Sequence, residues 1–415
     1  MSPTSHYLPR LLATVGRPDL AAHLQQWGPR PAGGPGLIHE LGRARLGGRG
    51  GAGFPATRKW SSVAERRGSV VVVNATEGEP ASNKDKTLLL HAPHLILDGA
   101  AMAAEAVGAS EVIVCIDEHA STAWRATGHA LAERARHRQD RVPVRMEVAP
   151  AGYVTGEESA LIGWINGAAP LPTFALRPWE QGVDGRPTLV HNPETLAHVA
   201  LIGRFGADWF ASVGGAAHPG SALVTISGDV RHPSVHEVAL GTRLTDLIGP
   251  AGPSEPVQGV LIGGYAGTWL DAAAVAAATV DPEGLAPAGA SLGCGVIVVV
   301  GPQSCGLRAV AAIASWLAGQ SAGQCGPCAR GLPTVADAVG RLVGPNAPPR
   351  WNAQIDRWLW MIEGRGACHH PDGAVRMIRS GIQAFQGEVD HHRHAGDCHR
   401  PAPPLALPRS SEVMV

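Results

Sequence analysis

The order of apolar and polar positions divides this chain into three stretches of different character. In the first stretch, the β-branched run Val70–Asn74 predicts a strand that is buried on both faces, and Leu95–Val107 predicts an alanine-rich helix with one apolar face. Glu111–Asp117, Ala123–Arg136 and Val142–Val148 continue as strand, helix and strand. This βαβαβ order predicts a parallel sheet in a three-layer α/β sandwich.

The second stretch is built from shorter apolar runs. Leu223–Gly228, Ser234–Val238, Leu244–Ile248 and Gly259–Gly264 predict short strands that alternate with one short helix, and Gly295–Gly301 predicts a further buried strand. The pattern predicts a small α+β module of about 75 residues.

The third stretch begins at Cys305 and has helical periodicity. It predicts a small bundle of four helices, Leu307–Leu317, Leu332–Leu342, Trp351–Ile362 and Gly373–Phe385. The proline-rich tail Arg400–Val415 is expected to be disordered.

Composition narrows the class of protein. The chain has 415 residues, 45% of them hydrophobic and 17% charged, which suits a globular protein with a large core. A net charge of -1 argues against nucleic-acid binding and against attraction to an anionic membrane surface. Arg308 and Ser315 interrupt the apolar stretch Gly306–Gly319, so no segment predicts insertion into a membrane. Seven cysteines without a secretory signal predict reduced thiols and a cytoplasmic protein.

A glycine-rich loop is the first candidate binding element. Four glycines occur within six residues, Gly48-Arg49-Gly50-Gly51-Ala52-Gly53, and the bulky pair Phe54-Pro55 closes the run. Glycine allows positive φ and lets backbone N–H groups approach a ligand, so the loop can cradle an anion or lie under an aromatic ring. Arg49 and Lys59 add cations that suit phosphate. A flexible surface loop is the alternative on composition alone.

Polar side chains gather where the first predicted strand ends. Asn74, Thr76, Glu77 and Glu79 follow its last apolar residue. Because ligands on open α/β sheets bind at the carboxyl ends of strands, these side chains are placed to hydrogen-bond a ligand. A solvated acidic turn is the alternative.

Two further helix starts carry polar residues. Thr155 or Gly156 is expected to cap a helix that opens with Glu157 and Glu158, whose carboxylates either favour the helix dipole or hold sugar hydroxyls. His191, Asn192 and Thr195 lie at a second helix start, which can receive phosphate. Asn192 is also a natural cap for that helix.

Three cysteines form the candidate metal site. Cys325 and Cys328 make a Cys-Gly-Pro-Cys turn, and Cys368 lies on the next loop between helices, a layout typical of an iron–sulfur or zinc site. A thioredoxin-type thiol pair is disfavoured because a helix, not a strand, precedes the motif. Structural zinc remains open, with His369 and His370 as spare ligands. The histidine-rich segment 391–399 either binds metal or is an incidental solvated cluster.

Together these segments resemble one family: the flavin-bearing, NADH-oxidising subunit of respiratory complex I and its soluble relatives in bacterial hydrogenases and formate dehydrogenases. The resemblance runs in order from Gly47 to Phe385 and fits a divergent, actinobacterial-type member. It is carried by Gly-Arg-Gly-Gly-Ala-Gly-Phe-Pro with Lys59-Trp60, Asn74-Ala75-Thr76-Glu77 with Glu79-Pro80, Tyr153 with Gly156-Glu157-Glu158, Asn192 with Glu194-Thr195-Leu196, and Cys-Gly-Pro-Cys with Cys368.

The resemblance implies three domains and a tail. Residues 1–215 would form a Rossmann-like FMN and NADH domain, and residues 216–302 a ubiquitin-like β-grasp module of the soluble-ligand-binding (SLBB) type. Residues 303–395 would form a helical iron–sulfur domain, and 396–415 a disordered tail.

The resemblance also implies roles for single residues. Phe54, Glu79, Tyr153 and Glu158 would lie against the nicotinamide nucleotide, with Glu79 and Glu158 as the catalytic pair. Cys325, Cys328 and Cys368 would bind the cluster. The flavin and nucleotide site would be completed by Gly48, Arg49, Gly50, Gly51, Ala52, Gly53, Lys59, Asn74, Thr76, Glu77, Gly156, Glu157, His191, Asn192 and Thr195.

Three departures from the family pattern change these expectations. Ala322 stands where the family has its first cluster cysteine, so a [4Fe-4S] cluster needs a fourth ligand from Ser321, Cys305, a histidine, water or a partner chain. A [3Fe-4S] cluster, or no cluster, is the alternative. Thr76 and His191 replace Asp and Asn among the flavin partners. Ser62 and the segment 174–179 alter the expected adenine contacts.

The implied activity is hydride transfer from NAD(P)H to FMN, followed by single-electron transfer through the cluster to a protein subunit or a ferredoxin-like protein, within a hetero-oligomer. A binding or assembly subunit that keeps the fold with a depleted cluster site is the alternative.

Overall fold

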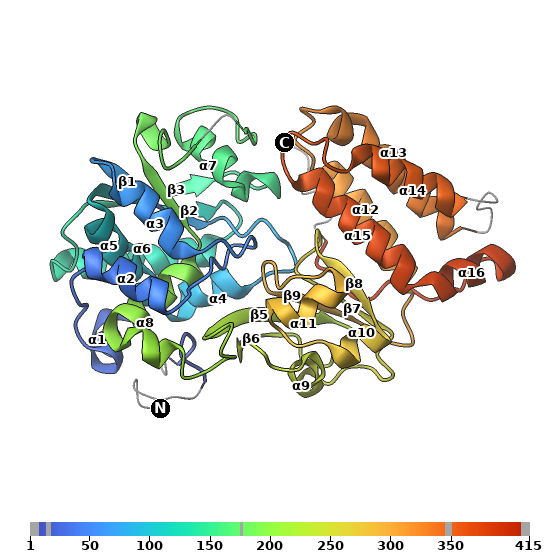
Figure 1. The fold of residues 1–415 in the computed structure, drawn as a ribbon, viewed down its shortest axis with the longest axis horizontal. Coiled ribbons are helices and arrows are strands. Elements are labelled where there is room, and N and C mark those ends of the chain that lie inside the picture. Colours follow the sequence, from blue (N-terminus) through green and yellow to red (C-terminus); the bar gives the residue numbers. More distant parts are fainter. Residues whose placement is uncertain (1–7, 14–17, 175–176, 345–350, 408–415) are drawn as a thin grey trace. The chain divides into compact units, whose positions relative to one another are not determined.

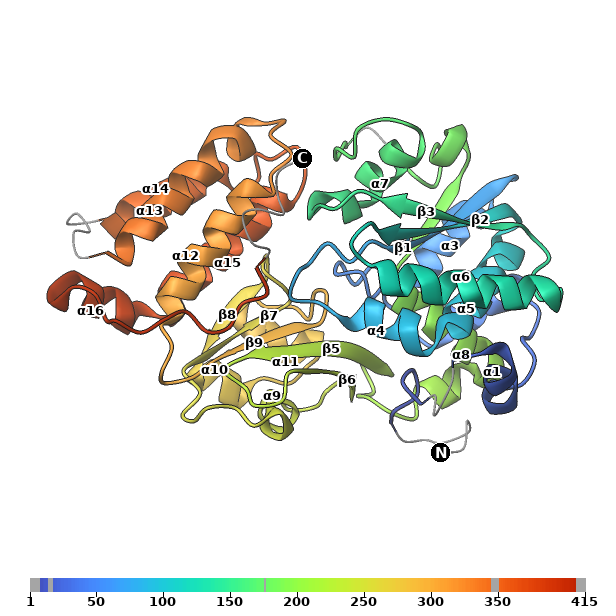
Figure 2. The same ribbon diagram turned by 180° about the vertical axis from the view of Figure 1, so that it is seen from behind.

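The structure is a computed structural model that describes residues 8–13, 18–174, 177–344 and 351–407 (Figures 1 and 2). The chain divides into two compact units. The first comprises Met1–Gly78, Asn83–Leu223 and Glu237–Gly241, and the second comprises Glu79–Ser82, Val224–His236 and Thr242–Val415.

The first unit is built on a parallel sheet with the strand order β3-β2-β1-β4. Its strands are β1 (Ser69–Ala75), β2 (Ala109–Asp117), β3 (Val144–Ala149) and β4 (Thr188–His191). All three pairings are parallel. The predicted parallel α/β arrangement is therefore confirmed, and β4 extends it by one strand beside β1.

Burial of both sheet faces explains the continuous β-branched sequence of β1. Val71 and Val73 pack into the larger core, together with side chains of α3 (Ala56–Ala64), α5 (Pro93–Val107), α6 (Ser121–Arg136) and α8 (Pro193–Phe210). Val70 and Val72 point the other way, into a smaller core with Leu161 of α7 (Glu158–Ile165). Successive strand residues point to opposite faces, so a strand covered on both sides needs an apolar residue at every position.

The longer helices of this unit lie at the predicted positions, and shorter helices precede them in the chain. Those predicted are α5 (Pro93–Val107) and α6 (Ser121–Arg136), and those that begin at the candidate site are α7 (Glu158–Ile165) and α8 (Pro193–Phe210). The others are α1 (Leu20–Trp27), α2 (Pro35–Arg43), α3 (Ala56–Ala64) and α4 (Lys84–His91).

The second sheet is mixed and has the strand order β6-β5-β9-β7-β8. Strands β5 and β9 are parallel, whereas β7 is antiparallel to both β8 and β9. The strands are β5 (Ser221–Gly228), β6 (Ser234–Ala239), β7 (Gly259–Ile262), β8 (Thr268–Asp271) and β9 (Val296–Val300), and the short helices are α9 (Leu244–Ile248), α10 (Ala272–Ala277) and α11 (Pro282–Leu285).

Five helices end the described chain. They are α12 (Gly306–Gly319), α13 (Leu332–Leu342), α14 (Trp351–Ile362), α15 (His370–Ala384) and α16 (Gln386–Ala395), and a π-helical turn (Pro327–Gly331) precedes α13. Helix α16 was not predicted, because its histidine-rich sequence has little apolar periodicity.

The described part of the tail differs from the expected disorder. The amide of Cys305 donates to the carbonyl of Pro401 at 2.6 Å, and Arg400 pairs with Glu388 at 2.9 Å. Residues 396–407 therefore have defined partners, while 408–415 lie outside the described residues.

Within the described ranges, no single helix is long and apolar enough to cross a membrane. Helices α4 and α5 pass that test only as a pair bent by 96°, and nearly all of α5 is buried in the core of the first unit.

Candidate functional site

The glycine loop forms a tight, bare turn before α3. The amide of Gly48 donates to the carbonyl of Phe54 at 2.9 Å, which closes the loop. Gly51 and Gly53 have φ values of 116° and 64°, a backbone region that side chains disfavour. A Cβ on Gly53 would meet nothing within 4 Å, so backbone faces open space there. The ring of Phe54 is 49% exposed beside this opening.

Arg49 anchors the loop to the protein. Its amide donates to Thr195 Oγ1 at 2.9 Å, and its guanidinium donates to the carbonyl of Ser221 at 2.9 Å and lies 3.7 Å from Glu194. Burial lowers the pKa of Arg49, and Glu194 partly offsets this effect. The guanidinium thus already has protein partners, which differs from the expected role as a cation for phosphate.

Lys59 joins α3 to α7 and to the end of β4. Its ammonium donates to Glu158 Oε2 at 2.7 Å and to the carbonyl of Val190 at 3.0 Å. Both side chains of this ion pair are partly exposed. Lys59 and Glu158, which sequence analysis placed in one site, are therefore adjacent.

The end of β1 meets the turn before α7. The side-chain amide of Asn74 donates to the carbonyl of Gly156 at 2.8 Å, and the hydroxyl of Thr76 donates to Asn74 Oδ1 at 2.8 Å. A Cβ on Gly156 would lie 2.8 Å from Thr76 Oγ1, so this contact requires glycine. The structure brings these three predicted site residues together.

Two predicted site carboxylates cap helices. Glu77, with φ of 36°, accepts from the amides of Asp85 and Lys86 at 3.0 Å in the first turn of α4. Glu157 is the N-cap of α7 and accepts from the amides of Ser159 and Ala160 at 3.0 Å. The prediction that Thr155 or Gly156 caps this helix is wrong, because the longer Glu157 side chain reaches these N–H groups.

His191 and Asn192 lie between β4 and α8. The indole N–H of Trp60 donates to His191 Nε2 at 2.7 Å. Burial, and then the charge of Lys59, holds the pKa of His191 well below its usual value, so the ring is a neutral acceptor. Asn192 caps α8 by accepting from the amide of Glu194 at 2.9 Å, as its alternative role predicted.

Sequence analysis missed a buried ionic cluster between α4 and α8. Lys84 lies 2.9 Å from both Asp85 and Glu194, and all three side chains are almost fully buried. Burial opposes ionisation of Glu194, but Lys84, His198 and Arg49 together lower its pKa to about 2. Burial raises the pKa of Asp85 to about 6 against the effect of Lys84. The available signal was the charged run Lys84-Asp85-Lys86, which opens α4 and also fits a solvated helix face.

Glu79 and Tyr153 each follow a glycine at which the chain packs closely. Glu79 is part of the second unit, where its carboxylate accepts from the amide of Tyr265 at 2.8 Å. In the first unit, a Cβ on Gly78 would lie 2.6 Å from the carbonyl of Gly152 and 3.2 Å from Tyr153 Cα, so the Tyr153 turn packs against bare backbone.

The structure brings the three predicted cluster cysteines together at the π-helical turn. Burial raises the pKa of Cys328 to about 12, and the thiols of Cys325 and Cys368 add to the increase. The hydroxyl of Ser321 hydrogen-bonds the same thiol. His370, considered as a spare ligand, instead has its Nε2 2.9 Å from the carbonyl of Leu317.

Comparisons with known proteins agree with this geometry. Residues 41–201 match the model of the Nuo51 FMN-binding domain, and residues 308–392 match that of the NADH-ubiquinone oxidoreductase-F iron-sulfur binding region. The F subunit of the NADH-quinone oxidoreductase of Rickettsia bellii is 31% identical over 85% of this chain and 89% of its own length. The chain belongs to the NADH-quinone oxidoreductase-F family.

Other relatives support the same assignment. The mitochondrial NADH dehydrogenase [ubiquinone] flavoprotein 1 of Dictyostelium discoideum is 30% identical over 85% of this chain and 78% of its own length. A chain of an NAD+-reducing [NiFe]-hydrogenase in the air-oxidized state is 28% identical and has a TM-score of 0.83, covering 94% of this chain and 68% of its own length. In the H2-reduced state the TM-score is 0.77, and this chain spans only 65% of the hydrogenase chain.

The residues present fit both cofactors of this family. The open backbone at Gly53 leaves room for a flat ring, and Lys59 supplies a cation next to the loop-helix junction. Three thiols and the Ser321 hydroxyl gather at the π-helical turn, a donor set that suits iron.

Proposed function

We infer that this chain is the FMN-dependent, NADH-oxidising subunit of a hetero-oligomeric oxidoreductase, which passes single electrons through an iron–sulfur cluster to a protein partner. The observation that carries this inference is the open glycine loop beside Lys59 and the Asn74–Thr76 strand end, in a chain that also gathers three cysteines. Bound FMN supplies the change from two-electron to one-electron chemistry, and the protein's part is to bind and orient the reactants.

The glycine loop is proposed as the bed for the flavin. Gly48, Gly50, Gly51, Ala52 and Gly53 present backbone without large side chains, and this lets a ring system approach within van der Waals distance. Arg49 serves by fixing the loop to Thr195 and Ser221, rather than by binding phosphate. The electrostatic role passes to Lys59, whose ammonium is partly exposed.

Side chains at the strand ends are proposed to orient the flavin and its ribityl chain. Asn74, Thr76 and Gly156 form one hydrogen-bonded group, and Asn192 with Thr195 forms another at the start of α8. Three other predicted residues are proposed to support this site without contacting the flavin. The carboxylates of Glu77 and Glu157 accept from helix N–H groups, and His191 accepts from the Trp60 indole.

The nicotinamide nucleotide is proposed to lie against Phe54 and Tyr153, with Glu158 nearby; the role of Glu79 stays a prediction from the family pattern. Phe54 offers an exposed ring for stacking. The Glu158 carboxylate is neutralised by Lys59, which lowers its repulsion of an anionic nucleotide. Ser62 and the segment 174–179 differ from the family's adenine-contacting residues, so the preferred nucleotide can differ too. NADPH is therefore tested beside NADH as the electron donor. Residues 175 and 176 of this segment lie outside the described chain.

Cys325, Cys328 and Cys368 are proposed to bind the cluster, with Ser321 as the fourth ligand in place of the cysteine lost at Ala322. Ser321 is favoured because its hydroxyl already contacts the Cys328 thiol. A [3Fe-4S] cluster without that ligand is the alternative.

The finer organisation is proposed from the family pattern: an FMN domain at 1–215, an SLBB β-grasp module at 216–302 and a helical cluster domain at 303–395. The electron acceptor is proposed to be another subunit or a ferredoxin-like protein, and the location to be the cytoplasm.

Flavin and iron measured on one anaerobic preparation test this function. The proposal expects FMN and iron in the same protein and bleaching of the flavin bands by NADH. Ala322 favours one competing function, a non-catalytic assembly subunit with a depleted cluster site. Protein that takes up neither FMN nor iron after reconstitution would support that competing function and contradict ours.

A further inference from the structure

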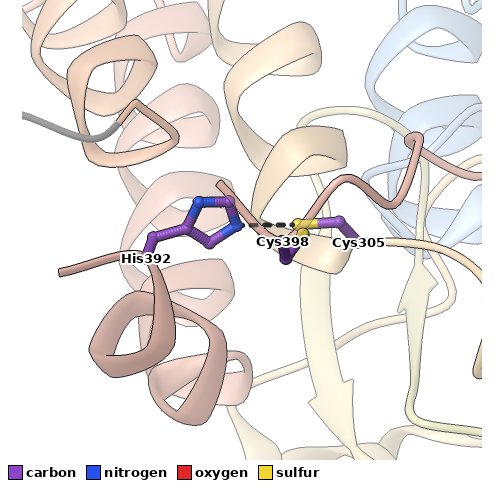
Figure 3. Close-up of side chains that lie close together, drawn as sticks. All are labelled: Cys305, His392 and Cys398. Atoms are coloured by element: carbon purple, nitrogen blue, oxygen red, sulfur yellow. Dashed lines mark hydrogen bonds between the residues drawn. The ribbon is translucent and has the colours of Figure 1, made fainter. Parts of the chain in front are cut away.

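A second group of metal-binding side chains lies away from the cluster cysteines in sequence. Cys305 is the residue before α12, His392 lies in α16, and Cys398 lies in the segment that follows α16. Their ligand atoms all lie within 4.8 Å of one another. Figure 3 shows the imidazole of His392 directed at the two thiols, with Nε2 3.5 Å from the Cys305 sulfur.

The burial of this group suits a metal ion and not a chance surface cluster. Cys305 and His392 are both 0% exposed, and Cys398 is half-buried. Two thiols and an imidazole whose ligand atoms converge are the donor set of a tetrahedral metal site. The half-exposed side of Cys398 leaves a route for an ion and for water.

The surroundings hold the three side chains in position. Glu388 Oε2 lies 3.3 Å from the Cys305 sulfur and accepts from the amide of Leu307 at 2.8 Å, so it is fixed by the first turn of α12. Glu388 Oε1 accepts from Arg400 at 2.9 Å. The Cys305 thiol donates to this carboxylate, so metal binding must displace the thiol proton, and Arg400 balances the charge of Glu388.

We propose that Cys305, His392 and Cys398 bind a structural Zn²⁺ ion, with water in the fourth position. Thiolate and imidazole are the ligands that zinc prefers in tetrahedral sites. Two thiolates balance the two positive charges of the ion, and the imidazole is neutral, so the filled site carries no net charge into the interior.

The site explains how the segment after α16 is held. That segment also contacts α12 through Arg308 with Asp397 and through the Cys305 amide with the Pro401 carbonyl. The zinc ion would join the start of α12 through Cys305, α16 through His392, and the segment after α16 through Cys398. The assignment also removes Cys305 from the possible ligands of the iron–sulfur cluster, because its sulfur faces the other group.

Metal analysis of the full chain tests this site. The chain is purified under reducing conditions with zinc supplied, and zinc and iron are measured per chain. We expect about one zinc ion per chain in the parent. Cys398→Ser and His392→Gln should lose most of it, whereas iron should not change. His391→Gln, an exposed histidine next in the sequence, and Cys294→Ser are matched controls that should keep the zinc.

Two further measurements keep the test decisive if a variant does not fold. Cobalt(II) added to metal-free parent should give the thiolate charge-transfer and d–d bands of a tetrahedral site. Removal of metal should speed hydrogen exchange of the Cys305 amide. Equal zinc content in the parent and all variants would overturn the proposal. So would a parent that is purified without zinc and in which mass analysis finds a disulfide between Cys305 and Cys398. Neither result depends on whether the chain binds FMN.

Discussion

Lys59 and Glu158 form an ion pair in which the ammonium nitrogen lies 2.7 Å from carboxylate oxygen Oε2. The pair joins the helix after the glycine loop to the start of α7. Glu158 therefore holds the Lys59 ammonium in a fixed position in the helix that follows the loop and balances part of its charge. An anionic cofactor in the loop could bind this cation without reorienting it.

Replacement of Lys59 tests this role in flavin binding. Lys59→Gln should weaken FMN binding roughly tenfold or more, or about 1.4 kcal/mol, because a charge-assisted hydrogen bond is lost. Titration of apoprotein with FMN, followed by quenching of flavin fluorescence, measures the Kd. Arg58→Gln changes the same charge on an exposed neighbour in α3 and should bind like the parent. Equal FMN affinity in the Lys59 variant and the parent would show that this cation does not contact the cofactor.

The missing cluster cysteine leads to a second prediction. Ala322→Cys restores a fourth thiolate near Cys325, Cys328 and Cys368, so iron and sulfide per chain should rise after anaerobic reconstitution. Ala353→Cys adds a thiol at an exposed position of α14 and should leave iron unchanged. If Ala322→Cys holds no more iron than the control, the depleted position is not part of the cluster site, or Ser321 already completes it.

Asp98 is the centre of a buried ion network in the first unit, and its removal should be costly. It pairs with Arg134 at 2.7 Å and His23 at 2.8 Å and also contacts Arg204. Asp98→Asn would leave buried cations short of a counter-charge, so the free energy of unfolding should fall by about 3–5 kcal/mol.

The matched control is Asp208→Asn, at a carboxylate that pairs with Arg43 at the same kind of distance but is 89% exposed. It should cost no more than about 1 kcal/mol. Denaturant unfolding of both variants measures the difference. Similar losses for the two would mean that burial does not set the strength of the Asp98 network.

His94 should make stability depend on pH. Burial, with help from His23 and Arg134, lowers the pKa of His94 from 6.5 to about 4. The folded protein therefore resists a proton that the unfolded chain accepts. The stability due to the neutral ring is complete above pH 6.5 and falls as the pH drops towards 4.

The comparison of parent with His94→Gln isolates this effect. The variant should lose less free energy of unfolding than the parent between pH 7 and about 4, because it has no imidazole to protonate. Denaturant midpoints at a series of pH values provide the data. Parallel curves for the two proteins would contradict a lowered pKa for His94.

Local pattern was enough to predict strands β1, β2 and β3 of the first unit, although it missed β4. Val70–Asn74 is apolar at nearly every position, and only a strand covered on both faces requires that. Asn74 and Thr76, at the end of this strand, hydrogen-bond the turn before α7 and each other, and their role toward a ligand stays a prediction.

Pattern could not predict contacts between distant polar residues. The pairing of Lys84 with Glu194 spans α4 and α8, and each residue alone looks like part of a solvated helix start. Cys305 and Cys398 are likewise far apart in the sequence, although their sulfur atoms are close in space. The histidine-rich sequence of α16 gave no sign that, of its histidines, only His392 is buried. Pattern also missed the protein partners of Arg49: its position in a glycine loop indicated phosphate, and its guanidinium contacts Ser221 and Glu194.

The most direct test of the account is an anaerobic titration of FMN-reconstituted protein with NADH, followed by the visible absorbance of the flavin. The account predicts that the protein retains FMN through gel filtration and that the flavin bands bleach as NADH is added. Protein that emerges colourless from reconstitution, or bound flavin that no nicotinamide nucleotide reduces, would contradict it.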